Sequence, residues 1–187
     1  MQNNVYVPEQ LMALWAKQIY SGMDFLGDAG ICHRAINPKH ILMTPAPDAE
    51  DSNRPLVKLS SFRDAVIYYD PSTGSIRNQP CRSVEKRKVA NYQAPEVFGN
   101  VTTEEYSPVQ ADVWSFGATF FYISTRTYAF RYKADVFDIA ADIQKTVYSA
   151  KTISDDAKRW FAGILHGNAA SRTPFDKIAA NAWFNSF

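Results

Sequence analysis

The stretch at residues 32–42, CHRAINPKHIL, decides how the chain is organised. It begins as a polar loop that contains a proline, and it runs into the short apolar segment 41–43. A second apolar segment, 56–59, follows a stretch at 45–55 that is rich in proline and acidic residues. Two short apolar runs separated by turn residues are typical of a β-hairpin. We therefore expect a hairpin with a solvated surface insertion directly after the loop.

Apolar residues at helical spacing lie on both sides of this hairpin. One helix is expected from about Pro8 to Gly27, and another over 109–123 is apolar almost all round, which indicates burial on every side. Further helices are expected at 135–148 with Asp135 as cap, at 154–165 with Ser154 near its start, and from Thr173-Pro174 onward. The segment 63–92 shows little periodicity and is expected to be a long loop. The pattern predicts one mainly α domain over residues 1–187 with one small β-hairpin.

The composition narrows the class of protein. The formal net charge is +1, from 20 basic and 19 acidic residues, and this balance argues against a nucleic-acid or membrane surface as the main partner. Only two cysteines occur, Cys32 and Cys81, so neither a disulfide framework nor a zinc cluster is implied. No apolar run approaches the roughly 18 residues of a membrane span. We expect a cytoplasmic globular protein.

Five motifs, in order along the chain, resemble the C-terminal lobe of a eukaryotic protein kinase. The stretch 32–42 resembles the catalytic loop H-R-D-x-K-P-x-N, and 57–63, VKLSSFR, resembles the strand that leads into D-F-G. Residues 94–96 are A-P-E, residues 112–117, DVWSFG, resemble the start of the family's central helix, and 165–184 resemble its closing helices. Within the family, the pattern is most similar to the calcium/calmodulin-type and muscle giant-kinase branches. The segment 63–92 then corresponds to an activation segment.

The positions that carry phosphoryl-transfer chemistry in that family hold other residues here. The catalytic aspartate corresponds to Ala35, the catalytic-loop lysine to Asn37, and the metal-binding asparagine to His40. In the D-F-G motif, Ser61 stands for the aspartate and Arg63 for the glycine. Loss of a general base alone costs about 10²–10⁴ in rate, and imidazole is a poor ligand for magnesium. No Gly-rich phosphate loop is found either. The resemblance therefore implies a pseudokinase C-lobe with its N-lobe absent, predicted inactive, for which ATP and magnesium are unlikely cofactors.

Residues that match the family's structural parts are kept. In the family, the aspartate at the position of Asp112 accepts hydrogen bonds from backbone amides of the catalytic loop, so Asp112 is expected to brace the loop at His33 and Arg34. Glu96 and Arg172 are expected to form the ion pair that ties the A-P-E segment to the closing helices. The resemblance thus implies an intact scaffold.

Some residues have functional alternatives. His33 and Arg34 have a structural interpretation, but Arg34 could instead receive a phosphate or an acid from the 63–92 loop, and Ser83 is a candidate regulatory phosphorylation site. His40 could be taken for a transition-metal ligand, although no second ligand stands at suitable spacing. Asp64 could substitute for the missing metal ligand but lies three residues from that position. The insertion at 45–55 could be a docking loop.

The leading functional hypothesis is a non-catalytic scaffold or protein-interaction module in signalling or cytoskeletal assembly. It would bind protein partners through the surfaces that kinases use for substrates and regulators, chiefly the 63–92 loop and the helix at 135–148, with neither nucleic acid nor membrane as partner. The alternative is a fragment of an ATP-binding serine/threonine kinase. A third interpretation is an incomplete gene product, whose exposed apolar face would contact an N-lobe or drive oligomerisation.

Overall fold

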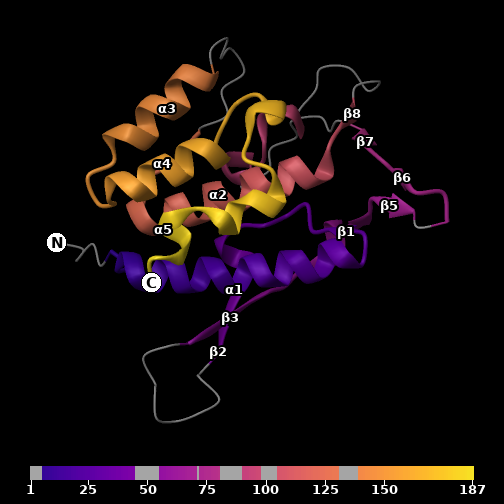
Figure 1. Ribbon diagram of the computed structural model, residues 1–187, viewed down its shortest axis with the longest axis horizontal. Helices are drawn as coiled ribbons and strands as arrows, with labels where there is room; N and C mark the ends of the chain where they lie inside the picture. The colour runs from indigo at the N-terminus through magenta and orange to yellow at the C-terminus, as the bar shows by residue number, and fades with distance from the viewer. Residues whose placement is uncertain (1–5, 45–54, 71, 81–89, 98–104, 131–138) are drawn as a thin grey trace.

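The computed structural model describes residues 6–44, 55–70, 72–80, 90–97, 105–130 and 139–187. Its helices surround one buried helix, and its strands form short antiparallel pairs (Figure 1). The candidate regulatory residue Ser83, the insertion at 45–54 and the cap Asp135 lie outside the described residues. No helix in the described ranges is long and apolar enough to cross a membrane.

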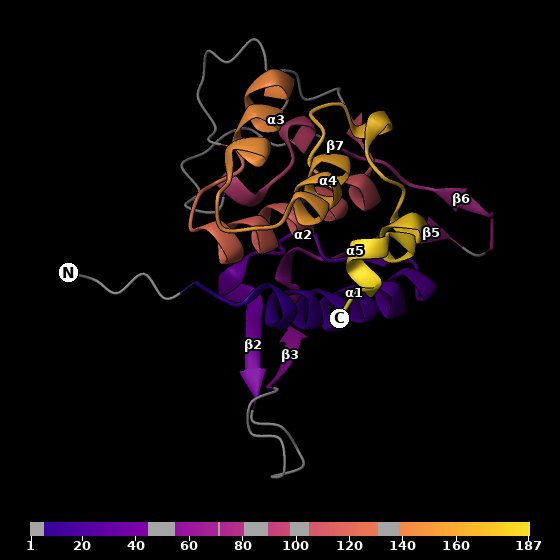
Figure 2. The same cartoon turned by 60° about the vertical axis from the view of Figure 1, so that its left-hand side comes forward.

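The first helix and the hairpin confirm the sequence prediction. Helix α1 spans Glu9–Asp28 and buries one face, which Met12, Ala16 and Ile19 occupy. Strands β2 (Ile41–Thr44) and β3 (Leu56–Leu59) pair antiparallel, with Ile41 opposite Leu59. This hairpin projects from the side of α1 that faces away from the other helices (Figure 2).

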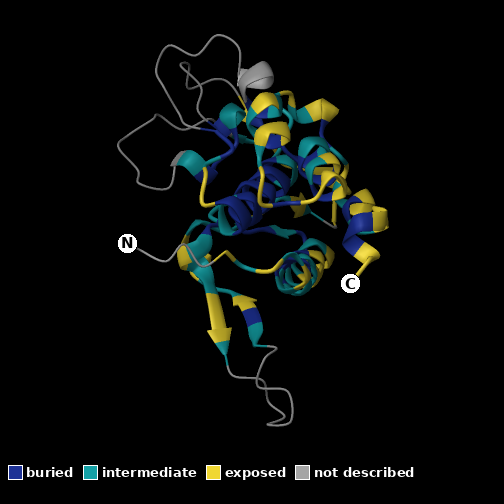
Figure 3. Cartoon of the chain, turned by 90° about the vertical axis from the view of Figure 1, so that its left-hand side faces the viewer, coloured by how far each residue is buried: buried dark blue, intermediate teal, exposed yellow. Residues whose placement is uncertain are grey.

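Helix α2, Pro108–Thr125, is the centre of the core (Figure 3). Ser107 caps it by accepting a hydrogen bond from the Gln110 amide, and Pro108 fits its first turn. Fourteen of its eighteen residues are buried, as its apolar sequence predicts. At Gly117 a Cβ would lie 2.6 Å from Cγ2 of Ile164, so the absence of a side chain allows helix α4 to pack closely.

The C-terminal helices cover one side of α2. Helix α3 spans Ile139–Ser149 and helix α4 spans Asp155–Ile164, where Ser154 accepts a hydrogen bond from the Ala157 amide as the cap. The final segment differs from the prediction of one helix after Thr173. It forms the 3-10 helix η7 (Phe175–Ala180), with Pro174 rather than Thr173 at the cap position, and then the short helix α5 (Ala182–Asn185). Shorter 3-10 turns occur at 38–40, 62–64, 90–92, 95–97 and 169–171.

The expectation of one small β-hairpin is wrong, because the described residues contain four two-stranded sheets. Strand β1 (Ile31–Cys32) pairs with β4 (Val66–Ile67), β5 (Tyr69–Asp70) with β6 (Ser75–Ile76), and β7 (Gln79–Pro80) with β8 (Glu105–Tyr106). The segment 63–92 is therefore not only loop. Strands of two residues are too short to show the alternation on which sequence prediction relies.

Candidate functional site

The catalytic-loop-like segment 33–40 is held in place by a carboxylate at the start of the central helix. Asp112 Oδ2 accepts a hydrogen bond from the His33 amide at 2.6 Å, and its Oδ1 accepts one from the Arg34 amide at 2.7 Å. Arg34 has a φ of 62°, a left-handed conformation that is unusual for a residue with a side chain. The two amide contacts favour this conformation, so Asp112 fixes the backbone of the loop. We refer to these two contacts as the Asp112 brace.

The Asp112 carboxylate is buried, and this burial has an electrostatic consequence. Removal from water raises the pKa of Asp112 to about 7, while the amides of Arg34 and His33 and the Arg34 guanidinium oppose the rise. A small cavity beside it is lined by residues of α1, β1 and α2, Cys32 of β1 among them, and by Tyr68 and Phe175. Burial also raises the pKa of the Cys32 thiol, with a further contribution from Asp112. A thiol in this environment is protonated and unreactive.

A network of side chains fixes the backbone at Ala35. The carbonyl oxygen of Ala35 lies 2.8 Å from Asn37 Nδ2 and 2.7 Å from His40 Nδ1, and its amide donates to His33 Nδ1 at 3.2 Å. Asn37 Oδ1 accepts from the Lys39 amide and caps the 3-10 helix η1 (Pro38–His40). At these positions Asn37 and His40 stabilise the turn, and Ala35 contributes only its backbone.

The D-F-G-like segment lies against this loop. Ser61 has a φ of 65° and precedes the 3-10 helix η3 (Phe62–Asp64). The Phe62 ring packs edge to face on His33, with ring centroids 5.0 Å apart. The side chains of Ser61 and Arg63 are exposed, and Asp64 is half-buried. The structure therefore brings Ala35, Asn37, His40 and Ser61 into one region, as the resemblance implies.

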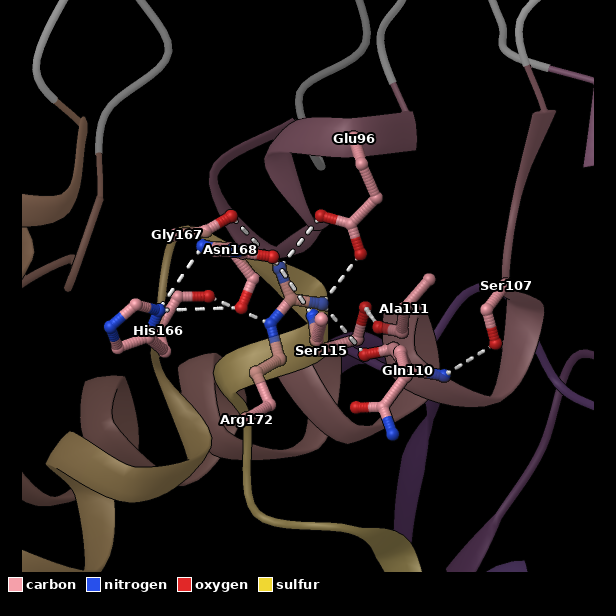
Figure 4. A network of polar contacts seen from close by, with 10 residues as sticks. Glu96, Ser107, Gln110, Ala111, Ser115, His166, Gly167, Asn168 and Arg172 are labelled. Carbon is pink, nitrogen blue, oxygen red and sulfur yellow. Dashed lines mark hydrogen bonds and ion pairs between the residues drawn. The ribbon is translucent and has the colours of Figure 1, made fainter.

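A second polar network ties the A-P-E segment to the C-terminal region (Figure 4). Arg172 Nη1 and Nη2 donate to Glu96 Oε1 and Oε2 at 2.5 and 2.7 Å, an arrangement with two parallel bonds. The same guanidinium donates to the backbone carbonyls of His166 at 2.8 Å and Gln110 at 2.9 Å. It also lies 4.9 Å from the centre of the Trp114 ring. This network is separate from the catalytic-loop region, and the two are connected through helix α2.

Sequence reasoning did not anticipate several contacts of the site. Arg34 Nη1 donates to Gln79 Oε1 of β7 at 3.3 Å, and the Arg34 guanidinium carbon lies 6.0 Å from the centre of the Tyr106 ring on β8. Glu9 accepts from the Ser154 amide and hydroxyl and from Trp183 Nε1, which joins three distant segments. Such contacts depend on backbone atoms and on distant residues, and no local pattern signals them.

The chemistry of the loop can be compared with the demands of magnesium, a hard cation that takes oxygen ligands in an octahedron. Among the described residues, no group of three or more His, Cys, Asp or Glu side chains is arranged to hold a metal ion. Ala35 has no donor atom, Ser61 offers a neutral hydroxyl, and the Nδ1 atom of His40 is directed at the Ala35 carbonyl. These side chains do not form the oxygen set that magnesium prefers. The assignment of Ala35, Asn37, His40, Ser61 and Arg63 to lost catalytic positions stays a prediction.

The family model and the similar proteins found by comparison all belong to the protein kinases. The family model described as protein kinase domain matches residues 1–184. Similar curated proteins include serine/threonine-protein kinase SRK2C of Arabidopsis thaliana (28% identical, covering 90% of this chain and 46% of that protein) and serine/threonine-protein kinase ATG1 of Pichia angusta (28%, 90% and 21%). CBL-interacting serine/threonine-protein kinase 15 of Arabidopsis thaliana is 26% identical, over 94% of this chain and 38% of that protein. The chain thus spans less than half the length of these relatives.

These matches correct three expectations. The family model covers nearly the whole chain, so the description as a C-lobe with its N-lobe absent is wrong. The relatives are named as kinases, and protein kinases are enzymes that use ATP and magnesium. The predictions that this chain is no enzyme and that ATP and magnesium are unlikely cofactors are therefore contradicted. They rested on elimination from single side chains, whereas phosphoryl transfer depends mainly on positioning and electrostatics, to which backbone and neighbouring groups contribute.

Fold, braced loop and sequence comparison lead to the same assignment. A protein kinase domain binds protein substrates or regulators, and the described residues keep the contacts that hold such a scaffold together. The match over residues 1–184 shows that this chain belongs to the protein kinase domain family.

Proposed function

We propose that this chain is a protein-interaction module of the kinase family, which acts in the cytoplasm in signalling or cytoskeletal assembly. The observation that carries the proposal is an apolar face displayed by the strands after the D-F-G-like segment. Ile67 and Ile76 are each 66% exposed, and Tyr69 is 38% exposed. Isolated apolar residues on a surface are ordinary, but neighbouring ones on one face are typical of a binding site.

The geometry of the strands places these three side chains together. Ile67 and Tyr69 are two residues apart on an extended segment, so they point to the same side, and Tyr69 is directly opposite Ile76 in the β5–β6 pair. Tyr68 points to the other side, where it lines the cavity next to Asp112. We call the surface of Ile67, Tyr69 and Ile76 the ribbon face. It lies in the segment through which kinases meet their substrates and regulators.

The ribbon face is also firmly attached to the scaffold. The Tyr68 amide donates to the Gly30 carbonyl at 2.8 Å, and the Arg77 amide donates to the Tyr68 carbonyl at 2.7 Å. Arg77 and Asp70 form an ion pair at 2.7 Å across the hairpin. A preorganised surface loses less conformational entropy when a partner binds, and this supports a role in recognition.

The test is a comparison of proteins captured by the chain in cells that express it. The double variant Ile67→Ser/Ile76→Ser removes the apolar side chains of the ribbon face. Met43→Ser is the matched control, because Met43 is also exposed (55%) but belongs to the hairpin on the far side of α1. We expect a partner that the wild type and Met43→Ser capture and the double variant loses. Equal capture by all three would contradict the proposal.

Phosphoryl transfer is the second candidate, and the named relatives favour it. A thermal-shift measurement with ATP, with and without magnesium, tests it directly. A ligand that binds only the folded state stabilises it by about 2.7 kcal/mol at one hundred times its dissociation constant. A magnesium-dependent shift, together with transfer of labelled phosphate to a protein acceptor, would support catalysis. The same assay decides the pseudokinase interpretation, which the comparisons do not support.

A further inference from the structure

The side chain of His33 connects three segments around the loop. It is fully buried, with Nε2 2.9 Å from the Ser60 carbonyl oxygen at the end of β3 and Nδ1 3.2 Å from the Ala35 amide nitrogen. A carbonyl oxygen only accepts and an amide N–H only donates. The neutral ring with its hydrogen on Nε2 therefore satisfies both nitrogens at once. The Phe62 ring of η3 packs edge to face against the imidazole.

Protonation would disrupt this arrangement at one specific atom. The imidazolium carries a second N–H at Nδ1, and this hydrogen would point at the N–H of Ala35. The hydrogen bond to Ala35 would be lost, and a positive charge would be buried. The bond from Nε2 to Ser60 would remain, because it needs a donor in both states. Protonation thus acts on the Ala35 end of the connection.

The charged groups around His33 do not remove this preference for the neutral ring. His40 lies on η1 with its ring centroid 6.3 Å away, Asp64 faces His33 from η3, and Asp112 of α2 holds the backbone amides of His33 and Arg34. Burial lowers the pKa of His33 and His40 adds to that effect, while the bond to Ser60 and the charge of Asp64 oppose it. The ring is consequently neutral at pH 7 and titrates at a pH below its ordinary range.

We propose that His33 is a pH-sensitive latch, which fastens Ala35 to the strand end at Ser60 while the imidazole is neutral and releases Ala35 when Nδ1 is protonated. The release is local, because the Asp112 brace holds His33 and Arg34 through their amides. The latch goes beyond the proposed protein interaction and does not depend on it. Its role is to make the shape of the loop centre, residues 35–37, responsive to acidification.

Two measurements on the wild-type chain test the latch. Nuclear magnetic resonance follows the His33 ring through its pH titration, and hydrogen exchange, corrected for the intrinsic effect of pH, follows the Ala35 amide. We expect protection of this amide to fall about tenfold or more as His33 protonates, the loss that corresponds to one hydrogen bond. The proposal is overturned if His33 titrates while the protection of Ala35 stays constant.

Variants at the three histidines separate the latch from general acid effects. In His33→Asn the step in Ala35 protection that accompanies the His33 titration should be absent, since no titrating group remains at this position, while the dependence that Asp112 contributes should stay. His166→Asn is the matched control, because His166 lies far along the chain in the turn before Arg172. In this variant the His33 ring and the protection of the Ala35 amide should respond to pH as they do in the wild type. In His40→Asn the midpoint of the His33 titration should stay in place or shift slightly upward, because the charge of His40 lowers the pKa of His33. If the asparagine variant at 33 fails to fold, the wild-type titration alone decides the question.

Discussion

The ion pair between Glu96 and Arg172 offers the sharpest test of how the scaffold is held together. Arg172→Met removes a side chain that is completely buried, and the carboxylate of Glu96, whose side chain is 22% exposed, loses the two hydrogen bonds that the guanidinium donates to it. The carbonyls of His166 and Gln110 also lose their donor. Removal of one partner of a buried pair costs about 3–5 kcal/mol. Since Glu96 retains some contact with water, we expect a loss of unfolding free energy of about 3 kcal/mol.

Urea denaturation of a small set of variants measures the loss of unfolding free energy and shows how much of it comes from the ion pair. Glu96→Gln keeps one acceptor for the guanidinium and should cost about 1–2 kcal/mol, while Arg172→Lys keeps the charge but not the paired geometry and should fall between wild type and Arg172→Met. The double variant Glu96→Gln/Arg172→Met should lose less unfolding free energy than the sum of the two single losses, and the difference, the coupling energy, should be about 1–3 kcal/mol. A cost below about 1 kcal/mol for Arg172→Met, or fully additive losses, would refute the reasoning.

Three further predictions concern the core and the loop. Gly117→Ala should destabilise the chain by about 1–3 kcal/mol in urea denaturation, because the new methyl group collides with Ile164; a change near zero would show that α4 moves freely. Glu9→Gln should cost about 1–2 kcal/mol and weaken the protection of the Ser154 amide in hydrogen exchange, while the exposed Asp156→Asn should change neither. For Asp112 the folded-state pKa of about 7 is higher than the ordinary value of 3.8, so its contribution to stability is complete below pH 4 and is lost as the pH rises to 7. In Asp112→Asn this part of the pH dependence should vanish, and an unchanged slope between pH 4 and 7 would count against the raised pKa.

The sequence predicts the long elements of this fold well, for physical reasons. The spacing of apolar residues determines α1, α2 and α4, and Ser154 is recognisable from its position as a cap. The pairs of two-residue strands could not be predicted, because Gln79 meets Tyr106 only through the tertiary fold. The 3-10 helix at 175–180 has no periodicity that separates it from an α-helix over so few residues.

The candidate site shows the same division between local and long-range information. The contacts of Asp112, Glu96 and Arg172 were expected from the family resemblance, and the structure contains these contacts. The acceptor for His33, a backbone carbonyl, leaves no trace in the sequence. The left-handed backbone at Arg34 and Ser61 is equally hidden, since glycine is the usual signal for it. The functional error came from treating the side chains at the positions assigned to catalysis as proof that an activity is absent.

The Asp112 brace has a consequence for how this chain can change over time. Within the described ranges, the hydrogen bonds that the carboxylate accepts come from main-chain N–H groups, and every residue except proline offers the same N–H group. The brace therefore constrains the path of the loop but is indifferent to the identity of the side chains that the loop carries. A change of the side chain at position 35 is compatible with the same loop path and the same surrounding architecture. In such a protein the side chains that carry chemistry can change without a change in the backbone path that holds them.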